Sequence, residues 1–344
     1  MPVRPPGTPR DLGVDAVRGL ALLSMYVAHT APWDAPPLVR ELSNLLTAAL
    51  FATLVGVGFG LGGSGWGARR GRRRSGWWAS LVRGGALVAL GLVLTRVDSL
   101  VIIILVHLGL LTWAMALLTR APLWFVACVG LVAFAGAPQL SSSLADDDAR
   151  LEATGPGWLA TLLDLAATGD AYRLTALLGW AVLGYLVARL LLHAPGRGRL
   201  ALVAGLLLLT GAAAIVAGMD QALTGSPVVP YSGTHLELVT NALLAAGVLL
   251  VGAAATRLVA GHGVGWLAGL GRMTLTLYCL HVLALALAQQ LLYDGGSPLG
   301  WRVTVSLALG SVAVALAWDS WQVTRRWGRG PLEGVVERVA RRTR

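Results

Sequence analysis

Charged and imidazole side chains inside long apolar runs are the residues of this sequence best suited to chemistry. The first apolar run, residues 12–31, contains Asp15, Arg18 and His29. Because such groups are costly to remove from water, each one inside a membrane span is a functional candidate. Arg18 and His29 are eleven residues apart, within about 20° of a whole number of helical turns. They therefore share a helix face, with His29 about 16 Å further along.

This face predicts an ion pair of Asp15 with Arg18 near one membrane surface and a basic imidazole near the other. Histidine suits general-base catalysis because imidazole changes its protonation near neutral pH. A structural interpretation is equally open. In it, Asp15 and Arg18 anchor the helix at one headgroup layer, and His29 lies at the opposite interface.

A second group of polar residues lies in the predicted helix 267–292. Thr274, Tyr278 and His281 are spaced four and three residues apart, which places them on one helix face. Tyr278 and His281 are candidates for lining a cavity opposite the first helix and for donating hydrogen bonds to a developing oxyanion. Hydrogen bonding between helices would explain the same pattern. Arg272, near the start of this helix, is a candidate contact for a phosphate or lipid headgroup.

Two further helices carry polar candidates for substrate binding. His107 is at mid-depth in the predicted helix 99–119, where it either faces a cavity or shares one structural hydrogen bond. His235 and Glu237 begin the helix 236–256, and Asn241 follows Glu237 by one turn. These three residues either receive the hydroxyl or amine of an acceptor, or mark the outer interface.

The second predicted helix ends in a glycine series, and an arginine cluster follows it. The cluster consists of Arg69, Arg70, Arg72, Arg73 and Arg74. Retention of positive charge in the cytoplasm explains the cluster; the functional alternative is a funnel for the phosphates of a ligand, which arginine recognises well. The glycine series follows no strand, so it predicts close helix packing rather than a phosphate-binding loop. Its members are Gly56, Gly58, Gly60, Gly62 and Gly63.

The elements that position these residues are membrane helices. The chain has 344 residues, 56% hydrophobic and 13% charged, and apolar runs of spanning length recur from end to end. About ten transmembrane helices are predicted, at residues 12–31, 42–63, 77–95, 99–119, 121–137, 172–192, 199–219, 236–256, 267–292 and 301–323. The fold class is therefore an all-α polytopic helical bundle. It forms one domain, residues 12–323, between an N-terminal tail, 1–11, and a basic C-terminal tail, 324–344.

The charge distribution sets the expected orientation and the expected partners. All 27 basic residues are arginine, and the net charge is +10. Most of the arginines fall in alternate loops and in the tails, which places both termini in the cytoplasm of a multi-pass plasma-membrane protein. That distribution disfavours nucleic acid and favours membrane lipids and phosphate-bearing small molecules. Cys128 and Cys279 lie in apolar runs, and no residue cluster has metal-ligand spacing, so no metal is expected.

The string VDAVRGLALLSMYVAHTAP of the first helix resembles the transmembrane acyltransferase superfamily. This superfamily includes the acyltransferase-3 proteins, the YeiB/DUF418 proteins and the heparan-α-glucosaminide N-acetyltransferase-like proteins. Arg18 and His29 fit the acyltransferase-3 spacing of arginine, ten residues, histidine. Other segments resemble the YeiB branch, in order along the chain: LFATLVGVGFGL, the run IIILVHLGLL, YRLTALLGWAVLGYLVARL, PYSGTHLEL and LGRMTLTLYCLH. The heparan-glucosaminide branch usually has asparagine where His29 stands and a catalytic histidine in the following outward loop. This chain has no histidine between residues 30 and 106.

The resemblance implies an acyl-CoA-dependent O- or N-acyltransferase of the cell envelope. It would move an acyl group, most simply acetyl, from a cytoplasmic acyl-coenzyme A (acyl-CoA) to a small-molecule, glycan or glycolipid acceptor that is extracytoplasmic or membrane-associated. The arginine cluster would then receive the phosphates of coenzyme A (CoA). His29 would then be the general base, with Asp15 and Arg18 near the donor. The alternative is a transporter or lipid-handling protein without covalent chemistry, because polar groups at several depths also suit a permeation path. Glycine-rich helix faces would permit a homodimer.

Overall fold

The computed structural model describes residues 12–62, 70–192, 197–219, 228–258, 264–292, 297–320 and 329–342, apart from the side chains of 70–75, 219, 257–258 and 342. Within these ranges the regular elements are all helical. The first half of the chain forms α1 (Leu12–Thr30), α2 (Pro37–Leu61), α3 (Arg70–Leu94), α4 (Leu105–Leu118), α5 (Leu123–Thr154), α6 (Gly157–Leu163) and the π-helical η1 (Asp164–Thr168). The second half forms α7 (Leu174–Val187), η2 (Ala188–Leu192), α8 (Gly198–Ala214), η3 (Ile215–Met219), α10 (His235–Leu258), α11 (Gly265–Arg272), α12 (Thr274–Leu292), α13 (Trp301–Ser320) and α15 (Pro331–Arg342).

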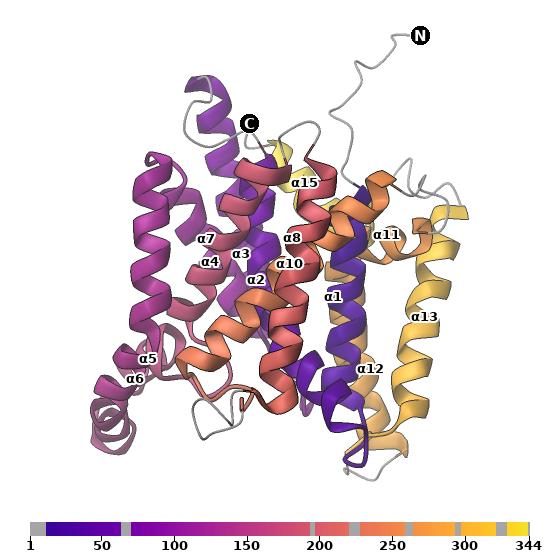
Figure 1. The fold of residues 1–344 in the computed structure, drawn as a ribbon. Helices are drawn as coiled ribbons and strands as arrows, with labels where there is room; N and C mark the ends of the chain where they lie inside the picture. The colour runs from indigo at the N-terminus through magenta and orange to yellow at the C-terminus, as the bar shows by residue number, and fades with distance from the viewer. Residues whose placement is uncertain are drawn as a thin grey trace.

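The described helices form a multi-pass membrane bundle. Eight of them are long and apolar enough to cross a bilayer: α2, α3, α5, α7 with η2, α8 with η3, α10, α12 and α13. With α1 and the shorter α4, they occupy the ten positions predicted from the sequence. Figure 1 shows the start of α1 and the helix α15 at the same end of the bundle. We call this end the terminal face, and the end that carries α6 the opposite face.

The bundle has a buried centre and a lipid-exposed periphery. More than half of the residues in the apolar windows of α2, α7 and α10 are buried, against 17% for α5, α8 and α13. Small residues bring the central helices together. A Cβ at Gly56 of α2 would lie 1.7 Å from the Ala181 carbonyl oxygen of α7, and one at Gly60 would lie 2.5 Å from the Ala188 Cβ. The predicted packing role of these two glycines is confirmed.

Gly58 differs from its two neighbours. A Cβ at this position meets nothing within 4 Å, and the residue lines a cavity at the terminal face. The interpretation of the whole series as packing glycines therefore fails at this residue. Gly58 leaves cavity space instead of admitting another helix.

Three helix boundaries differ from those expected. The helix predicted at 99–119 begins only at Leu105, and residues 101–104 before it have no regular secondary structure. Of these β-branched residues, which have a reduced helix propensity, Val101, Ile103 and Ile104 are buried and Ile102 is exposed. The helix expected to end at residue 137 continues through Pro138 to Thr154; a proline removes one hydrogen bond, and the polar residues beyond it need no lipid burial.

The third difference is a break in the helix predicted at 267–292. It ends at Arg272 and restarts at Thr274, giving α11 and α12. The tail expected at 324–344 contains a further helix, α15, which packs against α3 and α12. Both features shape the terminal-face cavity.

Candidate functional site

The ion pair predicted in the first helix is present at the terminal face. The Arg18 guanidinium lies 2.8 Å from the Asp15 carboxylate, and the side chains are 31% and 6% exposed. The short helix α11 holds this turn of α1 in place. A Cβ at Gly271 would lie 1.7 Å from the Asp15 carbonyl oxygen, and one at Gly19 would lie 2.2 Å from the Leu267 carbonyl oxygen. Only glycine permits this backbone approach without a shift of one helix.

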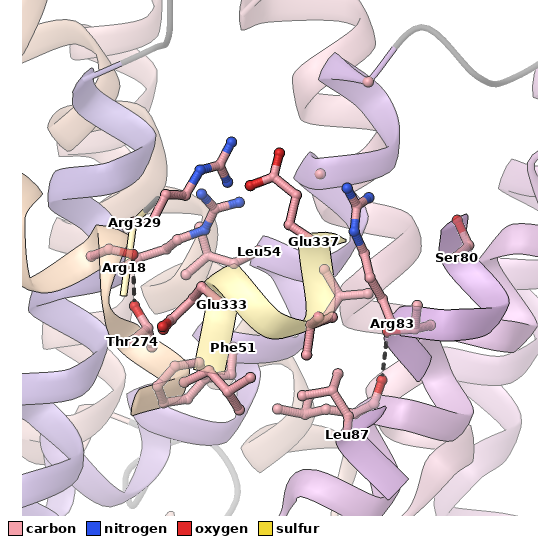
Figure 2. A pocket seen from close by; sticks show the side chains of 18 of the residues that line it. Arg18, Phe51, Leu54, Ser80, Arg83, Leu87, Thr274, Arg329, Glu333 and Glu337 are labelled. Carbon is pink, nitrogen blue, oxygen red and sulfur yellow. Dashed lines mark hydrogen bonds between the residues drawn. The ribbon is translucent and has the colours of Figure 1, made fainter. Parts of the chain in front are cut away.

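Asp15 and Arg18 line a cavity of about 560 Å³ among α1, α2, α3, α4, α11, α12 and α15. Its walls combine apolar and charged side chains. The apolar lining includes Phe51, Leu54, Leu87, Leu105 and Leu108, and the charged lining consists of Asp15, Arg18, Arg83, Arg272, Arg329, Glu333 and Glu337. Figure 2 shows the charged ends of Arg18, Arg83, Arg329 and Glu337 on one side of the cavity, with Phe51 and Leu87 on the other. The cavity is thus amphipathic and carries more arginine than carboxylate.

Arg272 and Glu337 of the lining each pair with a charged residue outside it. Arg272 pairs with Asp319 of α13, so a carboxylate outside the cavity lining directs its guanidinium. Glu337 accepts a hydrogen bond of 2.6 Å from Arg341. Burial raises the pKa of Glu337, but this bond and the charges of Arg329, Arg341 and Arg83 together hold the pKa below its ordinary value. Glu337 therefore stays ionised among the arginines.

His281, which was predicted to lie opposite the first helix, stacks on His29 of that helix. The ring centroids of His29 and His281 are 5.6 Å apart, and the ring planes differ by 13°. Tyr26 and Tyr278 flank His281, with ring centroids at 5.4 Å and 5.0 Å. Helices α1 and α12 thus form one cluster of His29, His281, Tyr26 and Tyr278, which we call the histidine pair with its two tyrosines.

Polar contacts hold α1 in the position that this cluster needs. The Tyr26 hydroxyl lies 2.8 Å from the Ser311 hydroxyl of α13, and Thr30 lies 2.8 Å from Thr304 of the same helix. On the other side, Ser24 is 2.8 Å from Thr47 of α2. These hydroxyl pairs fix the rotation of α1 between its neighbours, and so fix the direction of His29.

The contacts of His281 determine its tautomer. Its Nδ1 is hydrogen-bonded to the carbonyl oxygen of Tyr278. Since a carbonyl can only accept, Nδ1 carries the proton and Nε2 carries the lone pair. Nε2 of His281 and Nδ1 of His29 are buried and have no hydrogen-bond partner. The pair therefore offers unoccupied ring nitrogens inside the bundle, where such groups are ordinarily satisfied.

Tyr278 connects the cavity to the histidine pair. It lines the cavity, whereas His29 and His281 are absent from the lining, and its ring contacts His281 on the other side. Arg18 and His29 were predicted to share a face of the first helix, but the cavity that Arg18 lines does not include His29. The His29 ring stacks on His281, and the side chain of Tyr278 lies between His281 and the cavity.

His107 belongs to a neighbouring aromatic series toward the opposite face. Its ring lies 5.7 Å from that of Tyr172, which lies 6.3 Å from that of Tyr231. His107 is buried, and its environment is protein rather than lipid. The sequence also predicted substrate contacts at Glu237 and Asn241, which lie beside this series around a pocket of about 20 Å³.

Glu237 is engaged by its own loop. Its carboxylate accepts hydrogen bonds from the backbone N–H groups of Tyr231 (2.8 Å) and Gly233 (2.6 Å), and from the Asn241 amide (3.3 Å). Both loop residues have left-handed backbones, with φ of 64° at Tyr231 and 70° at Gly233. Of the two interpretations of Glu237, the geometry therefore favours the structural one: it anchors a strained loop.

The other predicted site residues lie apart from this core. His235 is exposed, with Nε2 3.0 Å from the Ala135 carbonyl oxygen and 3.1 Å from the Gln139 amide nitrogen of α5. It joins α10 to α5. Arg69 and the side chains of Arg70, Arg72, Arg73 and Arg74 lie outside the described residues.

The sequence reasoning missed Arg83, Arg329 and Glu333. Arg83 lies within the apolar run predicted at 77–95, and its charge inside that run was the signal that could have selected it. Arg329 and Glu333 belong to the segment treated as a tail. There, the apolar residues at 332, 335, 336 and 339 recur at helical spacing among charges, a pattern that predicts an amphipathic helix.

Comparison with known proteins agrees with one part of the resemblance described above. No curated protein matches the chain. Residues 184–343 match the family model described as "Protein of unknown function (DUF418)". The matched range contains Glu237, Tyr278 and His281 of the core and Glu333 of the cavity. The match supports the YeiB/DUF418 part of the resemblance, while the links to acyltransferase-3 and heparan-glucosaminide acetyltransferases stay predictions.

Proposed function

We propose that this protein is a membrane-embedded acyltransferase. It takes an acyl group, most simply acetyl, from a cytoplasmic acyl-CoA and transfers it to a hydroxyl or amine of an extracytoplasmic or membrane-associated acceptor, such as a sugar, glycolipid or metabolite. One observation carries the proposal. A stacked histidine pair with unoccupied ring nitrogens lies directly behind the wall of an arginine-lined cavity.

The cavity suits the donor because it is amphipathic. Arg18, Arg83 and Arg329 offer guanidinium groups at its charged side, and guanidinium groups bind phosphates through planar, charge-assisted hydrogen bonds. The apolar side suits the uncharged arm and acyl group of the thioester. In this proposal the terminal face is cytoplasmic and the membrane is the plasma membrane, in accord with the arginine distribution.

The histidine pair supplies the base. The acceptor's oxygen or nitrogen bonds to the acyl carbon while its proton passes to an imidazole. The carbon–sulfur bond then breaks, and the CoA thiolate takes up the proton. The sequence predicted this role for His29. His281 is the better prepared of the two, because the bond from its Nδ1 to Tyr278 leaves the Nε2 lone pair fixed in direction.

Tyr278 controls the meeting of the two substrates in this proposal. Its side chain stands between the cavity and His281, so the thioester reaches the base when this ring moves aside. Water is otherwise kept from the histidines, which limits hydrolysis of the donor.

The direct test is an assay of acyl transfer. Purified protein in lipid nanodiscs is incubated with radiolabelled acetyl-CoA and a panel of sugar, glycolipid and amine acceptors. Label in an acceptor, lost in His281→Ala, supports the proposal. Acceptor transport or CoA binding without any label transfer supports the transporter or lipid-handling alternative instead.

A further inference from the structure

The helix α15 crosses the mouth of the terminal-face cavity and contributes to its wall. Arg329, Glu333, Val336 and Glu337 of this segment all line the cavity, and Figure 2 shows α15 between Phe51 and the charged ends of Arg18 and Arg329. Ala340, on the same helix, is buried. A ligand that fills this cavity therefore has to contact α15 or displace it.

Thr276 of α12 makes three hydrogen bonds with α15, which also packs against α3. The Thr276 backbone N–H donates to Glu333 Oε1 (3.0 Å), and the Thr276 hydroxyl donates to Glu333 Oε2 (2.6 Å). The same hydroxyl accepts from the Leu332 N–H (3.2 Å). We call these three contacts the Glu333–Thr276 latch.

The latch places a carboxylate where α12 favours negative charge. Because α12 restarts at Thr274 after the break at Met273, the N–H of Thr276 lies in its first turn and has no partner four residues earlier within that helix. Gly330 makes the approach possible. A Cβ at Gly330 would lie 2.3 Å from Glu333 Oε2 and 3.2 Å from the Thr276 hydroxyl.

Docking of α15 also changes the charge of the cavity. Three of the seven charged lining residues belong to this segment, and two of those three are the carboxylates Glu333 and Glu337. When α15 is undocked, the remaining charged lining is Arg18, Arg83, Arg272 and the single carboxylate Asp15. The docked helix therefore both narrows the mouth and supplies negative charge that opposes an anionic ligand.

We propose that α15 is a displaceable autoinhibitory lid, which the Glu333–Thr276 latch holds on the cavity and which a phosphate-bearing ligand displaces. The identity of that ligand as an acyl-CoA rests on the proposed function. The competition between the lid and an anion does not depend on it.

The test uses full-length protein in nanodiscs and two anionic probes, CoA and inorganic pyrophosphate. Undocking of α15 is measured as the rate of tryptic cleavage at Arg338, which is exposed on this helix. Thr276→Val removes the latch hydroxyl without changing the cavity charge. It should raise the rate of cleavage at Arg338 and the rate at which a probe associates with the cavity, each about tenfold. This is the effect expected from the loss of one charge-assisted hydrogen bond. In the unaltered protein, each bound probe should also accelerate cleavage.

Val335→Ala is the matched control, because Val335 is exposed on α15 and belongs neither to the latch nor to the cavity lining. It should leave the cleavage rate without probe near that of the unaltered protein. Gly330→Ala should reproduce the effect of Thr276→Val by a steric route. The proposal is overturned if Thr276→Val cleaves and binds like the unaltered protein, or if neither probe accelerates cleavage. Acceleration of cleavage by pyrophosphate but not by CoA would support the lid and contradict acyl-CoA as the donor.

Discussion

His29 and His281 lie ring against ring, with centroids 5.6 Å apart and planes within 13° of parallel. The two residues come from opposite ends of the chain, and hydroxyl pairs between α1 and α13 keep the first ring in register. Two imidazoles in contact share one environment, so a change at either ring alters the other. We therefore expect the pair, and not one histidine alone, to act as the functional unit.

The first prediction concerns that unit. His29→Ala and His281→Ala should each insert into the membrane and each lose acyl transfer by about 10²–10⁴-fold, the usual effect of removing a general base. Because the rings act together, the double variant should lose little more than either single variant. The measurement is the initial rate of label transfer to an acceptor. His235→Ala, at an exposed histidine, should retain full activity; independent, additive losses would contradict the paired role.

The second prediction concerns the space beside Gly58. Gly58→Leu projects a side chain into the cavity that Gly58 lines, where a Cβ meets nothing within 4 Å. It should weaken CoA binding by tenfold or more while leaving thermal stability nearly unchanged, since no backbone is approached. Calorimetric titration with CoA measures the effect. Gly58→Ala should bind normally, and normal binding by Gly58→Leu would place the donor elsewhere.

The third prediction concerns the contact of α11 with α1. Gly271→Ala places a Cβ 1.7 Å from the Asp15 carbonyl oxygen, so one helix has to shift. Overpacking of this kind costs about 1–3 kcal/mol, seen as a lower thermal unfolding temperature in detergent. Gly310→Ala is the control, because its Cβ meets nothing within 4 Å and alanine favours a helix. Equal unfolding temperatures for the two variants would show that the approach is not tight.

The sequence was sufficient for the bundle and for part of the site. Hydrophobic run length alone located the ten helical positions, because a bilayer demands that length. Helical spacing predicted the contact of Arg18 with Asp15, because residues three apart are neighbours on a helix. It also predicted that His281 faces the first helix, because polar helix faces meet inside a bundle.

The parts that could not be predicted depend on contacts between distant segments. Nothing in the spacing of Tyr278 indicates that its ring separates the cavity from the histidines, because that depends on how α12 restarts after Met273. The placement of Glu333 against Thr276 is equally non-local. In the sequence, a Glu237 that anchors a loop looks the same as a Glu237 that contacts a substrate. Only the fold of residues 231–233 shows from which donors its carboxylate accepts hydrogen bonds.

The last prediction separates these two interpretations of Glu237. All of its described partners are donors: two backbone N–H groups, the Ser232 hydroxyl and the Asn241 amide. Glu237→Gln replaces one accepting oxygen by a donating NH₂ group, which leaves at least one part-buried backbone N–H facing another donor. The loss should be about 1–3 kcal/mol of stability, measured as a lower unfolding temperature.

Activity should distinguish an anchor from a substrate contact. At temperatures where Glu237→Gln is fully folded, its KM for the acceptor should equal that of the unaltered protein, because the carboxylate binds the loop of Tyr231 and Gly233 rather than a substrate. Asn241→Ala, which removes a single donor from the same carboxylate, should give a smaller loss of stability and the same KM. A raised KM with unchanged unfolding temperature in Glu237→Gln would instead make Glu237 a contact for the acceptor.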